Sequence, residues 1–161
     1  YFTDPPYGVD EDDRALDFSG VYRLDPDGSL TLLTREFNRP NGIVLSPDES
    51  RLYVNDSQEN IVRVYDVDED GSLTNGRLFA EPQDPEADGA TDGMKVDENG
   101  NLYTTGPGGV WIYSPDGELI DRLPVPEAPT NLAFGGSDMR TLYITAPPNV
   151  YRAPVTIAGL Q

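Results

Sequence analysis

The stretch RPNGIVLSPDESRLYV, residues 39–54, decides the fold. It contains two short apolar runs, IVL and LYV, and the residues SPDES between them are of the types that start and close tight turns. Further turn signals of this kind separate short apolar runs along the whole chain, and helical periodicity is nearly absent. Many short strands joined by regular turns predict an all-β fold.

The strand pattern also repeats. The run LYV is matched by LYT and LYI further along the chain, and each run follows an earlier matching segment that starts at Pro40, Thr91 or Thr130. Alignment of the repeats places a tyrosine at one equivalent position in each of them, and we call this set the tyrosine column: Tyr1, Tyr53, Tyr103 and Tyr143. A third strand follows each tyrosine, and a turn with a fourth strand follows in most repeats. Repeats of about 40 to 50 residues with four antiparallel strands are typical of β-propeller blades.

The number of blades suggests an incomplete ring. The first repeat lacks its innermost strand, two repeats are complete, and the last ends after its third strand. This amounts to about three and a half blades, fewer than the four that a closed ring needs. We therefore expect residues 1–161 to be the C-terminal part of a longer propeller, with a small β-sandwich as the alternative. An open array of blades exposes a strand edge and an apolar face, which favours self-association.

Composition excludes several kinds of chemistry. The 161 residues include no Cys and no His. Disulfides, thiolate or Ser-His-Asp catalysis and His-ligated zinc are therefore excluded within this sequence. No apolar run approaches the roughly 18 residues of a membrane span, and we expect a location in the cytoplasm rather than export.

The chain is strongly acidic, with 29 Asp and Glu against 11 Lys and Arg and a formal net charge of −18. This charge repels phosphate backbones, so nucleic acid is not expected as a partner. It suits cations. Lys95 is the single lysine, and an Asp-rich, Lys-poor surface also suits a protein adapted to high salt, because salt screens its self-repulsion.

One polar residue stands just before each predicted innermost strand. These residues are Asn41, Asp92 and Asn131. Equivalent positions of successive blades surround the central channel, so the three side chains should meet at its mouth. Oxygen donors of this kind are what a hard divalent cation such as calcium requires. In the alternative interpretation, Asn41–Gly42 and Asp92–Gly93 are simply tight-turn dipeptides.

Other polar residues near the predicted channel have two interpretations each. Asp4 and Asp56 follow the second strand of their blades, where they could face the channel or cap a loop. Residues 81–93 form a long polar loop that could cover the channel or only connect two blades. Tyr7, in the PPYG turn, could line a substrate pocket or pack against the neighbouring blade.

Five segments together resemble the gluconolactonase/regucalcin (senescence marker protein) family of six-bladed propellers. They are YFTDPPYG, RPNGIVLSPDESRLYV, TDGMKVDENGNLY, GPGGVWIYSPDGELI and PTNLAFGG, in this order along the chain. The resemblance covers nearly the whole sequence and rests on several linked motifs.

The resemblance implies a metal-dependent lactonase that hydrolyses an aldonolactone such as glucono-δ-lactone. The family holds one divalent cation, and calcium is expected here, with zinc, magnesium or manganese as alternatives. The implied ligands are a first-blade Glu, Asn41 and Asp92, and Asp92 would also transfer a proton. For Asn131 the resemblance implies only a place in the substrate pocket, not a role as a metal ligand. The first-blade Glu and a substrate-binding Arg-x-Asn-Asp segment lie outside this sequence, so it carries about half a site and alone could be inactive.

Two further functions remain open at this point, because propellers host many activities. One is a non-catalytic propeller that binds calcium or docks a partner protein through its acidic rim. The other keeps the fold and the metal but changes the reaction to another ester or phosphotriester hydrolysis, or to a strictosidine-synthase-like condensation.

Overall fold

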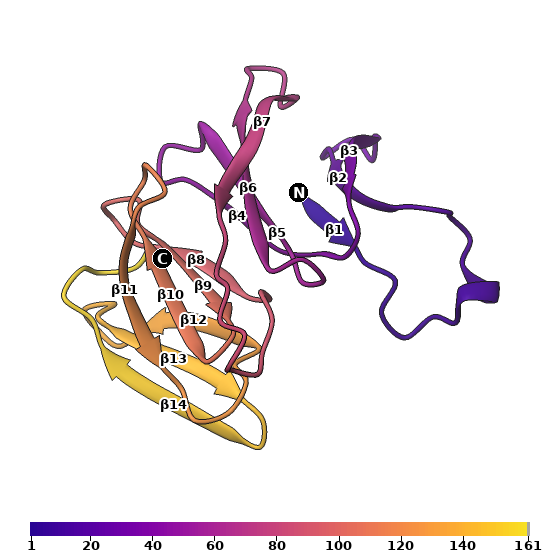
Figure 1. Cartoon of the computed structure of the whole chain (residues 1–161). Coiled ribbons are helices and arrows are strands. Elements are labelled where there is room, and N and C mark those ends of the chain that lie inside the picture. Colours follow the sequence, from indigo (N-terminus) through magenta and orange to yellow (C-terminus); the bar gives the residue numbers. More distant parts are fainter. Residues whose placement is uncertain (161) are drawn as a thin grey trace.

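The computed structural model describes residues 1–160, which form four antiparallel sheets arranged one after another along the chain (Figure 1). The inner strands of successive sheets contact one another in chain order. This confirms the prediction of all-β propeller blades, and the two facing sheets of a sandwich are not what the structure shows. Within residues 1–160, no helical structure has the length and apolar character that crossing a bilayer requires.

The strands of each sheet follow one another in space as they do in the sequence. The first sheet contains β1 (Phe2–Asp4), β2 (Ser19–Leu24) and β3 (Leu30–Phe37), with the short 3-10 helix η1 (Glu11–Asp13) between the first two. The second contains β4 (Pro40–Leu45), β5 (Arg51–Asp56), β6 (Ile61–Val67) and β7 (Leu73–Ala80). The third contains β8 (Met94–Val96), β9 (Leu102–Gly106), β10 (Gly109–Tyr113) and β11 (Leu119–Pro124). The fourth contains β12 (Asn131–Gly135), β13 (Thr141–Ala146) and β14 (Asn149–Pro154).

The predicted turn motifs close the hairpins at one end of the sheets. In four of them, the glycine in fourth position has a positive φ and its N–H donates to the carbonyl three residues earlier, at 2.8–2.9 Å: Gly28, Gly71, Gly100 and Gly117. The turn at residues 46–49 has the same hydrogen bond, from the Glu49 N–H to the Ser46 carbonyl at 2.9 Å. Glu49 therefore adopts a left-handed conformation, with φ of 57°, that glycine would adopt more easily.

The hydrophobic core consists of layers between neighbouring sheets. Side chains of a strand alternate between its two faces, so Leu52 and Val54 of β5 pack towards the first sheet, whereas Tyr53 packs towards the third. Both faces of β5 are covered, which explains why Leu52, Tyr53 and Val54 at its centre are all apolar rather than alternating with polar residues. A further layer joins the third and fourth sheets, around Tyr103 and Leu142.

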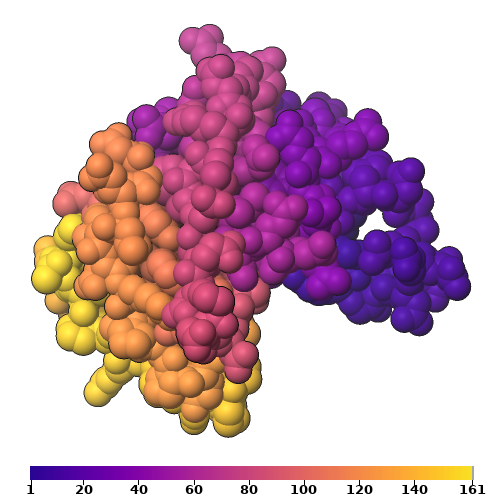
Figure 2. All heavy atoms as spheres, in the orientation of Figure 1, coloured from indigo at the N-terminus to yellow at the C-terminus, as the bar shows by residue number. Residues whose placement is uncertain are grey.

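The tyrosines of the column are most deeply buried in the second and third sheets, which have a sheet packed on both sides. Tyr53 and Tyr103 are 1% and 5% exposed, whereas Tyr143 of the fourth sheet is 41% exposed. The Tyr103 ring packs edge-on against Phe134 of the following sheet, with centroids 5.0 Å apart. The loop of residues 5–18 between β1 and β2 extends from the body of the sheets, as the indigo spheres of Figure 2 show.

Candidate functional site

Several loops meet where the inner strands begin. Pro40 at the start of β4 pairs with Asp56 at the end of β5, so the loops that follow β5 lie at this same end. The connections from β7 to β8 and from β11 to β12 arrive here as well. Together with the loop of residues 5–18 they surround a pocket of about 440 Å³, lined by Tyr7, Asn41, Ser57, Ala90, Thr91, Asp92, Ala128, Pro129 and Thr130.

Asn41 lies in strand β4 and not in a turn, so the turn interpretation of Asn41–Gly42 is wrong. The register of β4 against β5 shifts between Pro40 and Ile43, which places Asn41 in a local irregularity of the ladder. The Nδ2 of Asn41 donates to the Oγ of Ser57 at 3.0 Å. Its backbone carbonyl accepts a hydrogen bond from the hydroxyl of Thr3 at 2.7 Å. The amide oxygen Oδ1 is the atom left for a ligand.

Asp92 ends the loop of residues 81–93, directly before Gly93 and strand β8. Neither residue lies in a turn, so the turn interpretation of Asp92–Gly93 is also wrong. The Asp92 N–H donates to the Oγ1 of Thr105 at 2.9 Å, which attaches the loop to β9. Burial raises the pKa of the half-buried carboxyl, and the polar side chain of Asn41 opposes this effect.

The two glycines of these dipeptides are required by close packing between sheets. A Cβ on Gly42 would lie 1.9 Å from the carbonyl oxygen of Asp92. A Cβ on Gly93 would lie 2.2 Å from the Oδ1 of Asn131. Real Cβ atoms do not come so near to other atoms, so only glycine lets the inner strands approach this closely.

Asn131 lies beside the site rather than in its lining. It is the first residue of β12 and is exposed, and its Oδ1 accepts a hydrogen bond from the Leu132 N–H at 2.8 Å. Its neighbour Thr130 lines the pocket instead. The substrate contact expected of Asn131 stays a prediction.

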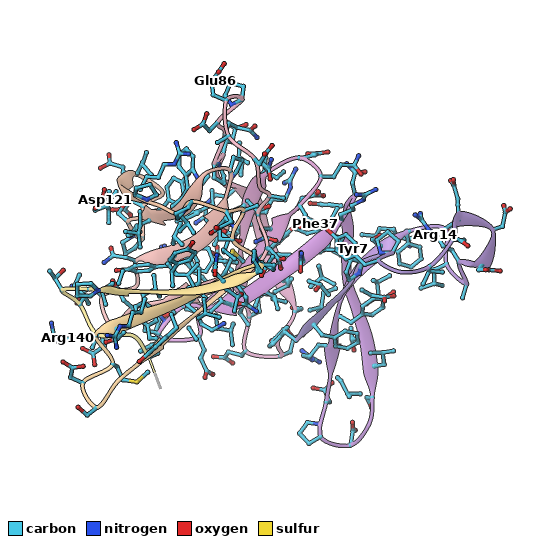
Figure 3. All side chains as sticks on the ribbon, turned by 90° about the horizontal axis from the view of Figure 1, so that it is seen from below. Tyr7, Arg14, Phe37, Glu86, Asp121 and Arg140 are labelled. Atoms are coloured by element: carbon cyan, nitrogen blue, oxygen red, sulfur yellow. The ribbon has the colours of Figure 1, made fainter. Side chains whose placement is uncertain are left out.

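Tyr7 lines the pocket from the loop of residues 5–18 and is 50% exposed. Figure 3 shows it near the sheets, with Arg14 farther out along the same loop. The phenol therefore stands on the same pocket as Asn41 and Asp92, although its contact with a substrate stays a prediction.

Asp56 caps loops and does not face the pocket. It is 1% exposed, and its Oδ2 accepts hydrogen bonds from the N–H groups of Asn38 and Arg39 at 2.6 and 3.1 Å. Its Oδ1 accepts from the N–H of Gln58 at 2.8 Å. Asp4 lines a separate hollow beneath the loop of residues 5–18. Neither carboxylate joins Asp92.

The donor atoms suit a hard cation, but they form only part of its shell. Asn41 supplies an amide oxygen and Asp92 a carboxylate, which are ligand types that calcium and magnesium prefer. Within residues 1–160, no group of three or more His, Cys, Asp or Glu side chains could hold a metal ion. Calcium takes about six to eight oxygens, so further ligands would have to come from water or from outside this sequence.

Comparison with known proteins assigns the chain to a family. Residues 1–147 match the SMP-30/Gluconolactonase/LRE-like region. The chain belongs to this family. The gluconolactonase of Zymomonas mobilis is 41% identical to this family member over an alignment of 170 residues, which covers 99% of this chain and 48% of the relative. The pentonolactonase XacC of Haloferax volcanii is 36% identical over 129 residues, covering 78% of this chain and 44% of the relative.

Comparison with solved structures supports the same family. The gluconolactonase XC5397 of Xanthomonas campestris superimposes on this family member with a TM-score of 0.82 and 34% identity, covering 95% of this chain and 52% of that one. The chain thus spans about half the length of the curated relatives it matches.

Ser57 and Thr130 are pocket residues that sequence reasoning did not identify. Neither belongs to a turn motif or to the column of polar residues before the inner strands. Their place depends on which loops meet at this end of the sheets, and no local pattern in the sequence reports that meeting.

Proposed function

We propose that the protein is a metal-dependent lactonase that opens a sugar lactone, an aldonolactone such as glucono-δ-lactone, to its hydroxy acid. The observation that carries the proposal is the pairing of the half-buried Asp92 carboxylate with the Asn41 amide on one pocket. Among the described lining residues of this pocket there is no Arg or Lys to neutralise Asp92. The relatives named gluconolactonase and pentonolactonase support the same reaction class.

A divalent cation bound at Asn41 and Asp92, with calcium expected, would supply Lewis-acid polarisation of the lactone carbonyl. Asn41 contributes an oxygen without adding negative charge, which leaves a cation electrophilic. The Asp92 carboxylate, which lines the pocket, is a base for the proton of the attacking water. Water adds to the carbonyl carbon, the ring C–O bond breaks, and the departing ring oxygen takes up a proton.

Substrate recognition would come from the loops around the pocket. Tyr7 presents an aromatic ring and a phenol, which can stack on a sugar ring and hydrogen-bond to its hydroxyls. Asn131 stands one residue beyond the pocket lining, where a larger lactone would reach it. In this proposal residues 1–161 are the C-terminal part of a six-bladed domain, and the remaining ligands come from outside this sequence.

The test measures acid release from glucono-δ-lactone with a pH indicator, using the longest natural form of the protein. Asp92→Asn should lower kcat/KM by about 100-fold or more, as expected for loss of a group that moves a proton. Glu86→Gln is the matched control, because it removes a charge at the outer tip of the same loop (Figure 3). EDTA should abolish turnover, and calcium should restore it.

Unchanged hydrolysis by Asp92→Asn would refute the assignment of this site. Calcium binding without turnover of any lactone would instead favour the non-catalytic binding propeller. Turnover of other esters or phosphotriesters, but not of lactones, would keep the site and change the substrate class.

A further inference from the structure

We infer that Asn55 is a positioning residue for this site, whose buried side chain fixes the separation of the Asn41 and Asp92 segments. The inference rests on the proposed function for what those two residues bind, and the contacts that carry it are independent of that function.

Asn55 bridges two sheets with its carboxamide. It lies in β5 and is 0% exposed. Its Oδ1 accepts a hydrogen bond from the N–H of Gly42 at 2.8 Å. Its Nδ2 donates to the backbone carbonyl of Asp92 at 2.7 Å. Gly42 directly follows Asn41, so one side chain ties together the backbones that carry both candidate ligands.

The local geometry makes this bridge possible. The register shift between Pro40 and Ile43 leaves the Gly42 N–H outside the regular ladder of β4 and β5, so it is available to Asn55. The missing Cβ of Gly42 leaves room for the Asp92 carbonyl, which a side chain would meet at 1.9 Å. The register shift and the glycine at position 42 therefore both allow Asn55 to bridge the Gly42 N–H and the Asp92 carbonyl.

A directional bridge is needed because β4 and β8 belong to different sheets. Strands within a sheet are spaced by ladder hydrogen bonds, whereas the second and third sheets are held by an apolar layer around Tyr53 and Met94 and by a few hydrogen bonds at Thr91. Apolar contacts are non-directional. A cation site requires its ligands within about 0.5 Å of their correct positions. The two hydrogen bonds of Asn55 supply that precision.

Side-chain contacts reinforce the bridge without replacing it. Ser57 accepts a hydrogen bond from Asn41 and donates one to the carbonyl of Thr91. Thr105 accepts from the Asp92 N–H. Asn55 differs from both, because one side chain holds a backbone group of each segment: the Gly42 N–H, next to Asn41, and the Asp92 carbonyl.

The test uses Asn55→Ala with Asn101→Ala as its matched control. Asn101 is also a buried amide, 8% exposed, and its Nδ2 donates to the Oδ2 of Asp97 at 2.8 Å. It lies before β9, at the end of the third sheet opposite the pocket. Both variants lose a buried carboxamide and should melt at a lower temperature. Calcium affinity, measured by calorimetry on the folded protein, should fall by about 10-fold or more in Asn55→Ala alone.

Amide hydrogen exchange gives a second readout that needs no metal. Asn55→Ala should speed exchange of the Gly42 N–H by about 10-fold or more and leave the Gly100 N–H unchanged. Asn101→Ala should leave the Gly42 exchange unchanged, because the Asn101 side chain bonds to the Asp97 carboxylate and not to the Gly42 segment. Asn55→Asp is the conservative variant: it keeps an acceptor for Gly42 but turns an anionic oxygen towards the Asp92 carbonyl, so its calcium affinity should fall as well.

Equal calcium affinities in Asn55→Ala and Asn101→Ala would overturn the inference, as would unchanged Gly42 exchange in Asn55→Ala. A wild-type protein that binds no divalent cation would contradict the proposed function instead. In that case the exchange measurement alone decides whether Asn55 sets the spacing.

Discussion

Glu49 holds a left-handed backbone conformation that glycine adopts in four equivalent turns. Its φ is 57°, while Gly28 in the equivalent turn of the first sheet has a φ of 88°. A left-handed conformation costs a residue with a Cβ roughly 1–2 kcal/mol, and Gly loses more chain entropy on folding, which offsets part of the gain. The turn at residues 46–50 is therefore a place where stability can be added.

We expect Glu49→Gly to raise the free energy of unfolding by a few tenths to about 1 kcal/mol. Gly28→Glu, the reverse change in an equivalent turn, should lower it by about 1–2 kcal/mol. Urea denaturation of both variants measures the difference. A loss of stability in Glu49→Gly would show that the Glu49 side chain stabilises the turn more than its backbone strains it.

Asp48 in the same turn makes stability depend on pH. Hydrogen bonds from the hydroxyls of Ser46 and Ser50 lower its pKa from 3.8 to about 2, and the Ser50 N–H adds to the effect. A carboxyl whose pKa is lower in the folded state stabilises the fold when ionised. This contribution is complete above about pH 3.8 and is lost as the pH falls through about 2.

Asp48→Asn should therefore be less stable than the wild type at pH 6, and the difference should shrink as the pH falls from 4 towards 2. Urea midpoints of both proteins along a pH series measure this difference. A difference that stays constant over the whole series would mean that the loss comes from changed hydrogen bonding and not from the charge of Asp48.

At the scale of elements, the contact between β4 and the segment before β8 is the tightest constraint near the pocket. Gly42→Ala places a methyl group against the backbone carbonyl of Asp92, which cannot rotate away. Gly135 in β12 is a useful comparison, because an added Cβ there would meet only the ring of Tyr143, at 2.9 Å. That ring is 41% exposed and can move.

We expect Gly42→Ala to cost about 1–3 kcal/mol of stability through overpacking and to weaken calcium binding. Gly135→Ala should cost less and leave calcium binding unchanged. Thermal unfolding and calorimetric titration of both variants provide the comparison. Equal losses of stability would show that the second and third sheets can separate to admit a methyl group.

At the scale of the whole molecule, the net charge governs self-repulsion, and the arrangement of the sheets decides which apolar side chains are exposed. A net charge of −18 on 161 residues repels itself in dilute buffer. The fourth sheet also exposes Tyr143 and Val150, which are 41% and 68% accessible. Apolar side chains of this kind on an uncovered sheet are where self-association, still a prediction, would take place.

The melting temperature should be higher in about 1 M KCl than in dilute buffer, because this salt shortens the screening length to about 3 Å. The triple variant Glu11→Gln, Asp12→Asn, Asp13→Asn removes three charges from η1 and should reduce the effect of salt. Equal melting temperatures of the wild type in both buffers would exclude adaptation to high salt as the reason for the acidic composition.

The sequence by itself determined the strands, the turns and the blade repeat of this protein, because side-chain alternation and turn chemistry are properties of neighbouring residues. The column of Asn41 and Asp92 was also predictable, since repeats place equivalent positions around one channel. Only the tertiary structure decided that Asn41–Gly42 is a strand irregularity, that Asp56 caps loops, and that Asn55 and Ser57 contact the segments of Asn41 and Asp92. The reason is sequence separation: Asn55 and Asp92 are 37 residues apart, and their contact exists only once two sheets have packed.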